Sequence, residues 1–130
     1  MPKRRSKFNA GKATVGDLKF DSALEAECYC HFRDGCRELG LTLELQPQFE
    51  LIPTQRPFKG KTLKKHTYTA DFRIRGGEHD IVIDVKSPAT AEKRDYVINE
   101  KLMLHTHQIL ITRITSPNEA AQLIDQLRHA

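Results

Sequence analysis

Apolar residues recur at helical spacing in three stretches of the chain, which predicts three helices. The first begins after Ser22, ends at Gly40, and has its apolar positions at Leu24, Cys28, Phe32 and Leu39. The second covers residues 91–106, with its apolar face at Val97, Ile98, Leu102 and His105. The third runs from Ser116 to about Arg128, because Ser-Pro-Asn-Glu supplies an N-cap, a proline at the first helical position and a capping glutamate.

Other stretches alternate between apolar and polar residues, which predicts strands with one buried face. Residues 43–52 place on one face Leu43, Leu45, Phe49 and Leu51. In residues 66–75 the apolar face consists of Tyr68, Ala70, Phe72 and Ile74. In residues 80–86 it consists of Ile81, Ile83 and Val85. The glycine pair between these two stretches predicts a hairpin. The β-branched residues 108–114 predict a fourth strand, and residues 13–20 predict a short hairpin that turns at Gly16-Asp17.

After the leading hairpin, the predicted elements follow the order α-β-β-β-α-β-α. A helix joins the third strand to the fourth, and such a crossover is typical of a mixed sheet flanked by helices. We therefore predict an α/β (α+β) fold with a mixed four-stranded sheet, an N-terminal hairpin and a C-terminal helix. The length of 130 residues suits a single domain over residues 12–130, preceded by a flexible basic arm over residues 1–11.

The formal net charge of +4 is distributed unevenly along the chain. Residues 1–20 carry six cations and one acid, whereas the remaining 110 residues carry 15 cations and 16 acids. A second basic cluster consists of Arg56, Lys59, Lys61, Lys64 and Lys65. Basic segments of this kind favour a polyanion, because each phosphate contact releases condensed counterions. The alternative for the N-terminal arm is that it only increases solubility. The slight excess of acids in residues 21–130 is compatible with a metal site in that part of the chain.

Composition and motifs exclude several classes of protein. No apolar run approaches the roughly 20 residues of a membrane-spanning helix, and no secretory signal is present, so we expect a cytoplasmic protein with no membrane partner. The clustered cysteines at positions 28, 30 and 36 are expected to be reduced thiols, and Cys28-x-Cys30-His31 lacks the second cysteine pair of a zinc site. Without a glycine-rich phosphate loop, no nucleotide cofactor is expected.

Charged side chains interrupt the apolar pattern of two neighbouring strands. Asp84 and Lys86 lie at the end of one strand, and alternation places their side chains on the same face. Asp71, in the preceding strand of the hairpin, can lie beside them on the neighbouring strand. Two carboxylates and the backbone carbonyl of Val85 form an oxygen cage for Mg²⁺ or Mn²⁺, which supports phosphodiester hydrolysis. The lysine can orient or deprotonate the attacking water, or stabilise the phosphate. The alternatives are a surface Asp84–Lys86 pair, and an Asp71 that pairs with Arg73 or caps a bulge.

Glu25 lies one turn into the first predicted helix and has two interpretations. A carboxylate at this position can lean over the sheet toward the metal. The segment Ser22-x-x-Glu25 is also a capping box, which stabilises a helix by on the order of 1 kcal/mol. The spacing alone favours the cap.

Taken in order, these motifs resemble the PD-(D/E)xK nuclease superfamily. The matching residues are Glu25, Ala70-Asp71, where alanine replaces the usual proline, and Asp84-Val85-Lys86 on an α-β-β-β-α-β frame. A small phage-encoded family of this fold is matched by Lys7-Phe-Asn-Ala, Phe20-Asp-Ser, Leu43-Glu-Leu-Gln-Pro-Gln-Phe-Glu-Leu and Tyr68-Thr-Ala-Asp-Phe. In size and motif order the chain is similar to phage endonuclease I, a four-way-junction resolvase. The resemblance covers about residues 7–115 and implies a restriction-endonuclease-like αβββαβ core.

The resemblance implies a divalent-metal phosphodiesterase that uses Mg²⁺ or Mn²⁺. Asp71 and Asp84 would bind the metal, Lys86 would be the catalytic lysine, and Glu25 would be the helix acid that assists the metal. The implied substrate is branched or structured DNA in the cytoplasm of a bacterial host, and a phage or prophage origin is expected. A homodimer is also expected, because cutting two strands needs two sites.

Contacts with the DNA backbone are expected from basic residues outside the catalytic motif. These residues are Lys3, Arg4, Arg5, Lys7, Lys59, Lys61, Lys64, Lys65, Arg94 and Lys101. A solvated helix face is the alternative for Arg94 and Lys101. The alternative functions are a non-catalytic DNA-binding module of the same fold and a sequence-specific or transposon-end nuclease, and the motifs do not distinguish DNA from RNA.

Overall fold

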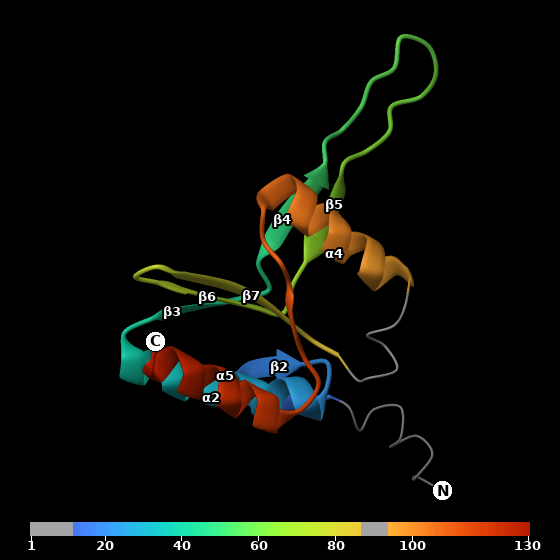
Figure 1. The fold of residues 1–130 in the computed structure, drawn as a ribbon. Coiled ribbons are helices and arrows are strands. Elements are labelled where there is room, and N and C mark those ends of the chain that lie inside the picture. Colours follow the sequence, from blue (N-terminus) through green and yellow to red (C-terminus); the bar gives the residue numbers. More distant parts are fainter. Residues whose placement is uncertain (1–11, 87–93) are drawn as a thin grey trace, which may run out of the picture.

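The computed structural model describes residues 12–86 and 94–130 (Figure 1). The strands are β1 (Ala13–Val15), β2 (Leu18–Phe20), β3 (Thr42–Leu45), β4 (Gln48–Ile52), β5 (His66–Thr69), β6 (Phe72–Gly76), β7 (His79–Val85) and β8 (Thr112–Ile114). The helices are α2 (Ala23–Leu39), α4 (Arg94–His107) and α5 (Pro117–Arg128). The basic arm predicted over residues 1–11 lies outside the described residues.

Four strands form a mixed sheet in the order β3-β6-β7-β8. β6 pairs antiparallel with both β3 and β7, whereas β7 and β8 are parallel. The segment between β7 and β8 contains α4, the crossover helix that a parallel pair requires. The predicted α+β class, with a mixed four-stranded sheet and flanking helices, is therefore confirmed. β1 and β2 form the predicted leading hairpin around Gly16.

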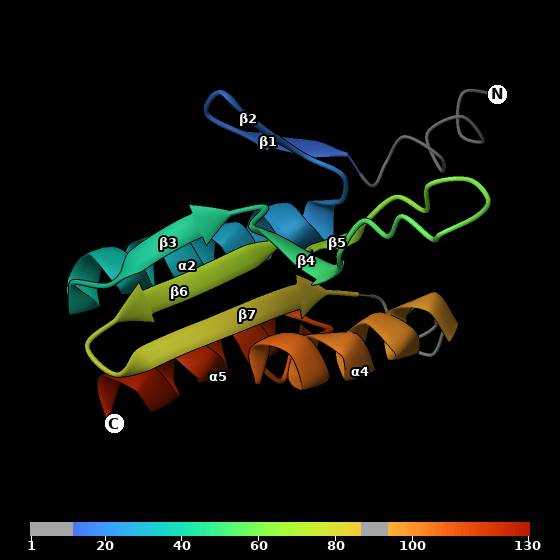
Figure 2. The same cartoon turned by 90° about the horizontal axis from the view of Figure 1, so that it is seen from above.

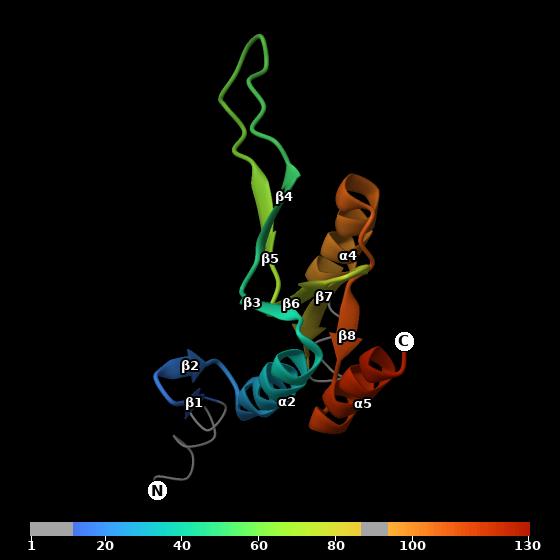
Figure 3. The ribbon, with the colours of Figure 1, turned by 90° about the vertical axis from the view of Figure 1, so that its left-hand side faces the viewer.

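Both faces of the sheet are covered (Figures 2 and 3). α2 and α5 lie on one face, where the fully buried Phe72 and Ile83 belong to one hydrophobic cluster. α4 and the β4–β5 pair lie on the other face, over a second cluster that includes Tyr68, Val82 and Met103. Val82 and Ile83 are consecutive in β7, and strand alternation sends them to opposite clusters. β7 is therefore buried on both faces.

The ends of α2 and α5 confirm the predicted caps. Ser22 Oγ accepts a hydrogen bond from the backbone N–H of Glu25 at 3.0 Å, and Gly40 ends α2 in the left-handed conformation with φ 71°. Ser116 Oγ accepts a hydrogen bond from the N–H of Glu119 at 3.2 Å at the start of α5. Local sequence thus determines where both helices begin. Among the described residues, no helix has both the length and the apolar composition needed to cross a membrane.

The two long strands predicted over residues 43–52 and 66–75 are each broken near the middle. Gln46 (φ 51°) and Pro47 separate β3 from β4, and Ala70 and Asp71 separate β5 from β6. The N–H of Gln46 donates to the carbonyl of Asp71 at 3.0 Å, and the N–H of Ala70 donates to the carbonyl of Pro47 at 3.0 Å. These bonds join the breaks, so the strands form one ribbon that bends as it leaves the sheet (Figure 3).

The bend contradicts the prediction that each of these strands presents one apolar face. Phe72 packs in the α2–α5 cluster, whereas Tyr68 packs in the opposite cluster. On the partner strand, Leu43 packs against the first cluster, Phe49 belongs to the second, and Leu45 between them is 36% exposed. A left-handed residue followed by proline interrupts the period of two, so the alternation before the bend does not continue after it.

Two predictions near the C-terminal third are also wrong in detail. The buried residues of α4 are Tyr96 and Met103, which are seven positions apart and share a helical face, whereas Ile98 and His105 are exposed. The strand predicted over residues 108–114 is limited to β8. Gln108 has a left-handed backbone (φ 60°), which directs the chain away from α4 before β8 can begin.

The β4–β5 ribbon continues beyond the body of the molecule as a hairpin extension, residues 53–65 (Figures 1 and 3). All of these residues are exposed. Gln55 and Leu63 pair through two backbone hydrogen bonds, of 2.8 and 2.9 Å. The second basic cluster of the sequence therefore lies on a paired extension of the β4–β5 ribbon.

Candidate active site

The end of β7 brings Asp84 and Lys86 together, as strand alternation predicts. Lys86 Nζ lies 3.4 Å from Asp84 Oδ2. Asp84 is 1% exposed, and Lys86 is half-buried. The alternative of a surface ion pair is therefore wrong, because an ionised carboxylate this deeply buried needs specific partners to be stable.

Asp71 lies at the bend of the ribbon, beside the end of β7. Its backbone N–H donates to the carbonyl of Ile83 at 3.1 Å, and its Oδ2 accepts a hydrogen bond from the N–H of Val85 at 2.7 Å. The Asp71 carboxylate is thus bonded to the residue between Asp84 and Lys86. The bend therefore brings the two acids and the lysine of the predicted motif to one place.

Arg73, considered from the sequence as a partner for Asp71, is engaged elsewhere. It makes two hydrogen bonds with the carboxylate of Asp80, of 2.8 and 2.9 Å. Its guanidinium also lies 5.1 Å from the centre of the Phe49 ring. Arg73 supports the β6–β7 pair rather than the candidate site.

Asp84 helps to raise the pKa of two neighbouring acids. Burial and the neighbouring Asp84 raise the pKa of Asp71 to about 8. Burial, Asp21 and Asp84 raise the pKa of Glu25, an effect that Lys86 opposes. Carboxylates that disfavour one another's charged forms favour a cation, because a cation would stabilise those charged forms.

The backbone of Glu25 takes part in the predicted cap, and its buried side chain points to a separate role. Its backbone N–H makes the cap with Ser22 Oγ. Within the described residues, its carboxylate makes no hydrogen bond back to the Ser22 N–H, so only half of a capping box is formed. Glu25 is 8% exposed, and its carboxylate is close enough to Asp84 and Lys86 for both to affect its pKa. The carboxylate is therefore within electrostatic range of Asp84 and Lys86, and its role as an acid that assists a metal remains a prediction.

We expect Glu25→Gln to weaken Mn²⁺ binding by about 10-fold without lowering the free energy of unfolding of the metal-free protein. Glutamine keeps the backbone cap and removes only the charge. Titration calorimetry with Mn²⁺ and urea denaturation measure the two effects. Ser22→Ala is the matched control, expected to lose about 1 kcal/mol of stability with unchanged Mn²⁺ affinity. If Glu25→Gln behaves like Ser22→Ala, Glu25 is only part of the cap.

A cavity of about 320 Å³ opens beside Asp84 and Lys86, on the side of α4. It is lined by Thr67, Tyr68, Thr69, Asp84, Lys86, Asp95, Tyr96 and Asn99. In the parts of the chain that the structure describes, the buried side-chain atoms without a hydrogen-bond partner are Tyr68 Oη, Tyr96 Oη and Asp84 Oδ2. All three belong to residues of this cavity lining. Since a buried unpaired polar group costs about 1–3 kcal/mol, the cavity suits a polar ligand.

The two tyrosines are site residues that sequence reasoning misses. Alternation assigns Tyr68 to a core face and gives no reason to select Tyr96. Burial and the nearby Asp84 raise the pKa of both hydroxyls, that of Tyr96 to about 12, so both remain hydrogen-bond donors. Lys86 Nζ also lies 5.6 Å from the centre of the Tyr96 ring. The available signal is that Tyr96 and Asn99 share a face of the helix that follows the Asp-x-Lys motif.

The site offers two close carboxylates rather than a complete metal cage. Within residues 12–86 and 94–130, no group of three or more His, Cys, Asp or Glu side chains could hold a metal ion. Mg²⁺ usually keeps several water ligands and takes only one or two protein carboxylates. Asp84 Oδ2 has Lys86 as an ion-pair partner but no hydrogen bond, and a divalent cation would stabilise both this oxygen and the charged form of Asp71. The carboxylates of Asp71 and Asp84 therefore match the oxygen ligands that Mg²⁺ or Mn²⁺ prefers.

The basic residues predicted to contact DNA are distributed over several elements. Lys59, Lys61, Lys64 and Lys65 are exposed on the hairpin extension. Lys101 is exposed on α4, and Arg94 is the first residue of that helix. Lys3, Arg4, Arg5 and Lys7 lie outside the described residues.

The cysteines take no part in the site. Cys28, Cys30 and Cys36 are free thiols. Cys28 is fully buried in the α2–α5 cluster, and burial raises its pKa to about 12. Because metal ligands and nucleophiles require the thiolate, this buried thiol is a core residue.

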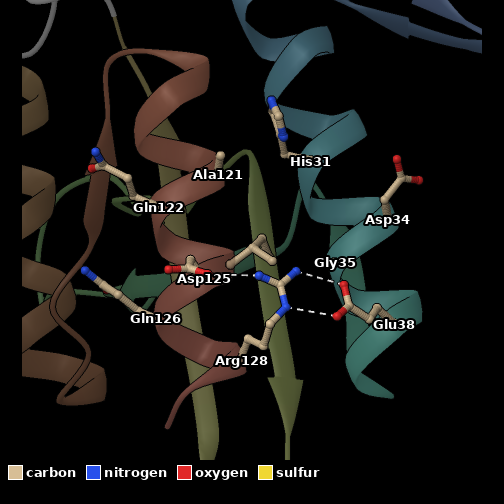
Figure 4. A pocket seen from close by; sticks show the side chains of 10 residues that line it. His31, Asp34, Gly35, Glu38, Ala121, Gln122, Asp125, Gln126 and Arg128 are labelled. Carbon is tan, nitrogen blue, oxygen red and sulfur yellow. Dashed lines mark hydrogen bonds and ion pairs between the residues drawn. The ribbon is translucent and has the colours of Figure 1, made fainter.

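A larger hollow of about 640 Å³ lies between α2 and α5 (Figure 4). The two helices approach closely at Gly35, where a Cβ would lie 2.5 Å from Ile124 Cγ2. Arg128 of α5 joins the helices through two hydrogen bonds to Glu38, of 2.8 and 2.9 Å, and also bonds Asp125 at 3.0 Å (Figure 4). These charged groups satisfy one another, and the hollow contains none of the predicted catalytic residues.

Comparison with known proteins assigns this chain to a family but gives no activity for it. No curated protein and no solved structure matches the chain. A family model described as "Protein of unknown function (DUF1064)" matches residues 5–116. The match covers most of the chain and includes the whole candidate site, so the chain belongs to the DUF1064 family.

Proposed function

We propose that this chain is a divalent-metal-dependent endodeoxyribonuclease with a restriction-endonuclease-like core. The observation that carries the proposal is the convergence of Asp71, Asp84 and Lys86 at the end of β7, beside a cavity with unpartnered oxygen atoms. Two carboxylates and an ammonium group at one point are well suited to metal-assisted phosphodiester hydrolysis. The order of the elements and the motif resemblance support the same conclusion.

The metal ligands in this proposal are Asp71, Asp84 and the Val85 carbonyl, with Glu25 assisting. A bound Mg²⁺ or Mn²⁺ would lower the pKa of a water molecule and neutralise charge that develops on the phosphate. The Asp71 carboxylate is already oriented by its hydrogen bond from the Val85 N–H. This orientation favours metal binding at the point where the ribbon and β7 meet.

Lys86 and the two tyrosines have roles on the substrate side of the cavity. Lys86 Nζ lies 3.4 Å from Asp84 Oδ2, from where it could orient the attacking water or donate to a phosphate oxygen. The protonated hydroxyls of Tyr68 and Tyr96 supply two further donors on the same cavity wall. Hydrogen-bond donors fixed in advance stabilise negative charge on a phosphate in the transition state.

DNA is the substrate class that the surface charge favours. The exposed lysines of the hairpin extension and Lys101 of α4 can neutralise phosphates without reading bases. We propose branched or structured DNA in the cytoplasm of a bacterial host as the substrate. A homodimer would supply one site for each strand of such a substrate.

A non-catalytic DNA-binding module of the same fold is the second candidate. The absence of a three-residue metal-binding group among the described residues favours it. It leaves unexplained why the half-buried Asp71 is placed beside the buried Asp84, whose charge raises the pKa of Asp71.

A cleavage assay separates the two candidates. End-labelled four-way junction, nicked duplex, linear duplex, single-stranded DNA and single-stranded RNA are incubated with Mg²⁺, Mn²⁺ or EDTA. We expect cleavage of the junction or the nicked duplex that requires the metal. Binding without cleavage of any substrate supports the binding module, and cleavage that persists in EDTA contradicts the proposed mechanism.

A further inference from the structure

The hairpin extension is an ordered, paired structure that ends in a small loop. Besides the Gln55–Leu63 pair, the N–H of Lys65 donates to Thr54 Oγ1 at 3.2 Å. These bonds close the loop formed by residues 56–62. The loop therefore stands at a defined distance from the sheet, at the far end of the ribbon (Figures 1 and 3).

An exposed aromatic side chain marks this loop. Phe58 is 97% exposed, whereas Phe49 and Tyr68, on the same ribbon closer to the sheet, are 6% and 5% exposed. A phenylalanine side chain this exposed adds very little to the stability of the core. Its apolar surface is available to a partner.

The charge around Phe58 favours a polyanion as that partner. Residues 53–65 contain five cations and no acid, and all of them are exposed. Within the described part of the chain, none of the five forms an ion pair with an acidic side chain. Two copies of such an extension would repel each other, whereas a nucleic acid would bind to it.

An exposed aromatic ring among cations is a combination suited to bases that are not paired. Every base has a face on which a ring can stack, and flanking lysines or arginines hold the phosphates on either side. In a continuous duplex the bases are stacked on one another, and their faces are inaccessible. The loop therefore favours DNA in which a base is unpaired or displaced.

The ribbon also connects the loop to the candidate site. Tyr68, on the same ribbon, lines the cavity of Asp84 and Lys86, and Asp71 lies at the bend of that ribbon. We propose that Phe58 stacks on an unpaired or displaced base while Arg56, Lys59 and Lys61 bind the flanking phosphates. This inference rests on the proposed nuclease function, and it names the structural feature of the DNA that the protein recognises.

The test measures binding by the full-length chain carrying Lys86→Ala, so that cleavage does not interfere. The probe is a gapped duplex with 2-aminopurine at an unpaired position, compared with a continuous duplex of the same length. We expect Phe58→Ala to weaken binding to the gapped duplex by about 5- to 100-fold and to the continuous duplex by less than about 2-fold. The quenching of 2-aminopurine fluorescence on binding should disappear in Phe58→Ala and return in Phe58→Tyr.

Thr62→Ala is the matched control, because it changes an exposed neutral residue of the same loop. Equal weakening on both duplexes by Phe58→Ala, or no weakening on either, would overturn the inference. Sedimentation of each variant is also measured. A dimer that becomes a monomer in Phe58→Ala identifies Phe58 as a contact between copies and overturns the inference. None of these readouts depends on cleavage, so the cleavage assay tests the nuclease proposal separately.

Discussion

Lys86→Met is expected to reduce single-turnover cleavage of a four-way junction in Mg²⁺ by roughly 100- to 10,000-fold, the contribution typical of a positioned proton-transfer group. Methionine fills a similar volume but cannot carry the ammonium group that lies 3.4 Å from Asp84 Oδ2. The variant should still fold, because Lys86 is half-buried at a strand end and is not part of either hydrophobic cluster. Its DNA affinity in EDTA should change by less than about 3-fold, since one phosphate contact at most is lost.

Lys19→Met makes the same chemical change at an exposed lysine of β2, outside the candidate site. We expect it to cleave like the parent chain. Cleavage by Lys86→Met within 10-fold of the parent rate would show that the lysine is not part of the reaction. Lys86→Arg then distinguishes the two roles of the lysine. An arginine can hold the phosphate but cannot act as a base at neutral pH, because it stays charged.

The metal-free protein is expected to lose stability as the pH rises from about 5 to 8. Burial and Asp84 raise the pKa of Asp71 to about 8, from an ordinary value of 3.8. Across this range the folded chain retains a proton that the unfolded chain releases, so the free energy of unfolding falls with rising pH. We expect a loss of roughly 3–4 kcal/mol at pH 8 relative to pH 5. Urea denaturation in EDTA at several pH values measures it.

Asp71→Asn is expected to remove most of this slope and to stabilise the metal-free protein at pH 8. Asparagine stays neutral, and its amide oxygen can accept the hydrogen bond from the Val85 N–H. The difference in slope between parent and variant is the quantity to compare, because it isolates the contribution of residue 71. Mg²⁺ should restore the stability of the parent at pH 8 but not that of the variant.

Asp80→Asn is the control for this experiment. The hydrogen bond from Arg73 lowers the pKa of Asp80, so the stability it contributes is present above pH 4 and is lost only in more acidic solution. Asp80→Asn should therefore lower stability by a similar amount at pH 5 and pH 8. A slope in Asp71→Asn equal to that of the parent would contradict the assignment to Asp71.

The features that can be predicted from the sequence are those that depend on neighbours in the chain. Ser22, Gly40 and Ser116 mark helix ends, because capping groups act within three or four residues of backbone. The face shared by Asp84 and Lys86 follows from strand alternation alone. The mixed sheet follows from the order of the elements, since a helix between two strands permits a parallel pair.

The bend at Gln46-Pro47 and Ala70-Asp71 could not be predicted from alternation. Leu43 to Leu51 continue with apolar residues at every second position up to the proline and beyond it, so the pattern conceals the change of face. The bend depends on hydrogen bonds between residues more than 20 positions apart, such as that from the Gln46 N–H to the Asp71 carbonyl. Tertiary pairing of this kind overrides a local period.

The sequence by itself determined the caps, the strand faces within each unbroken stretch, and the three residue types that metal-assisted hydrolysis requires. Only the tertiary structure decided that Asp71 bonds to the Val85 N–H, that Glu25 is buried on α2, and that Tyr68 and Tyr96 line one cavity. Contacts within a few residues depend on local geometry, which sequence patterns reflect. Contacts between distant elements depend on how the ribbon bends and how α4 packs, and buried polar groups then take whichever partners the packing provides.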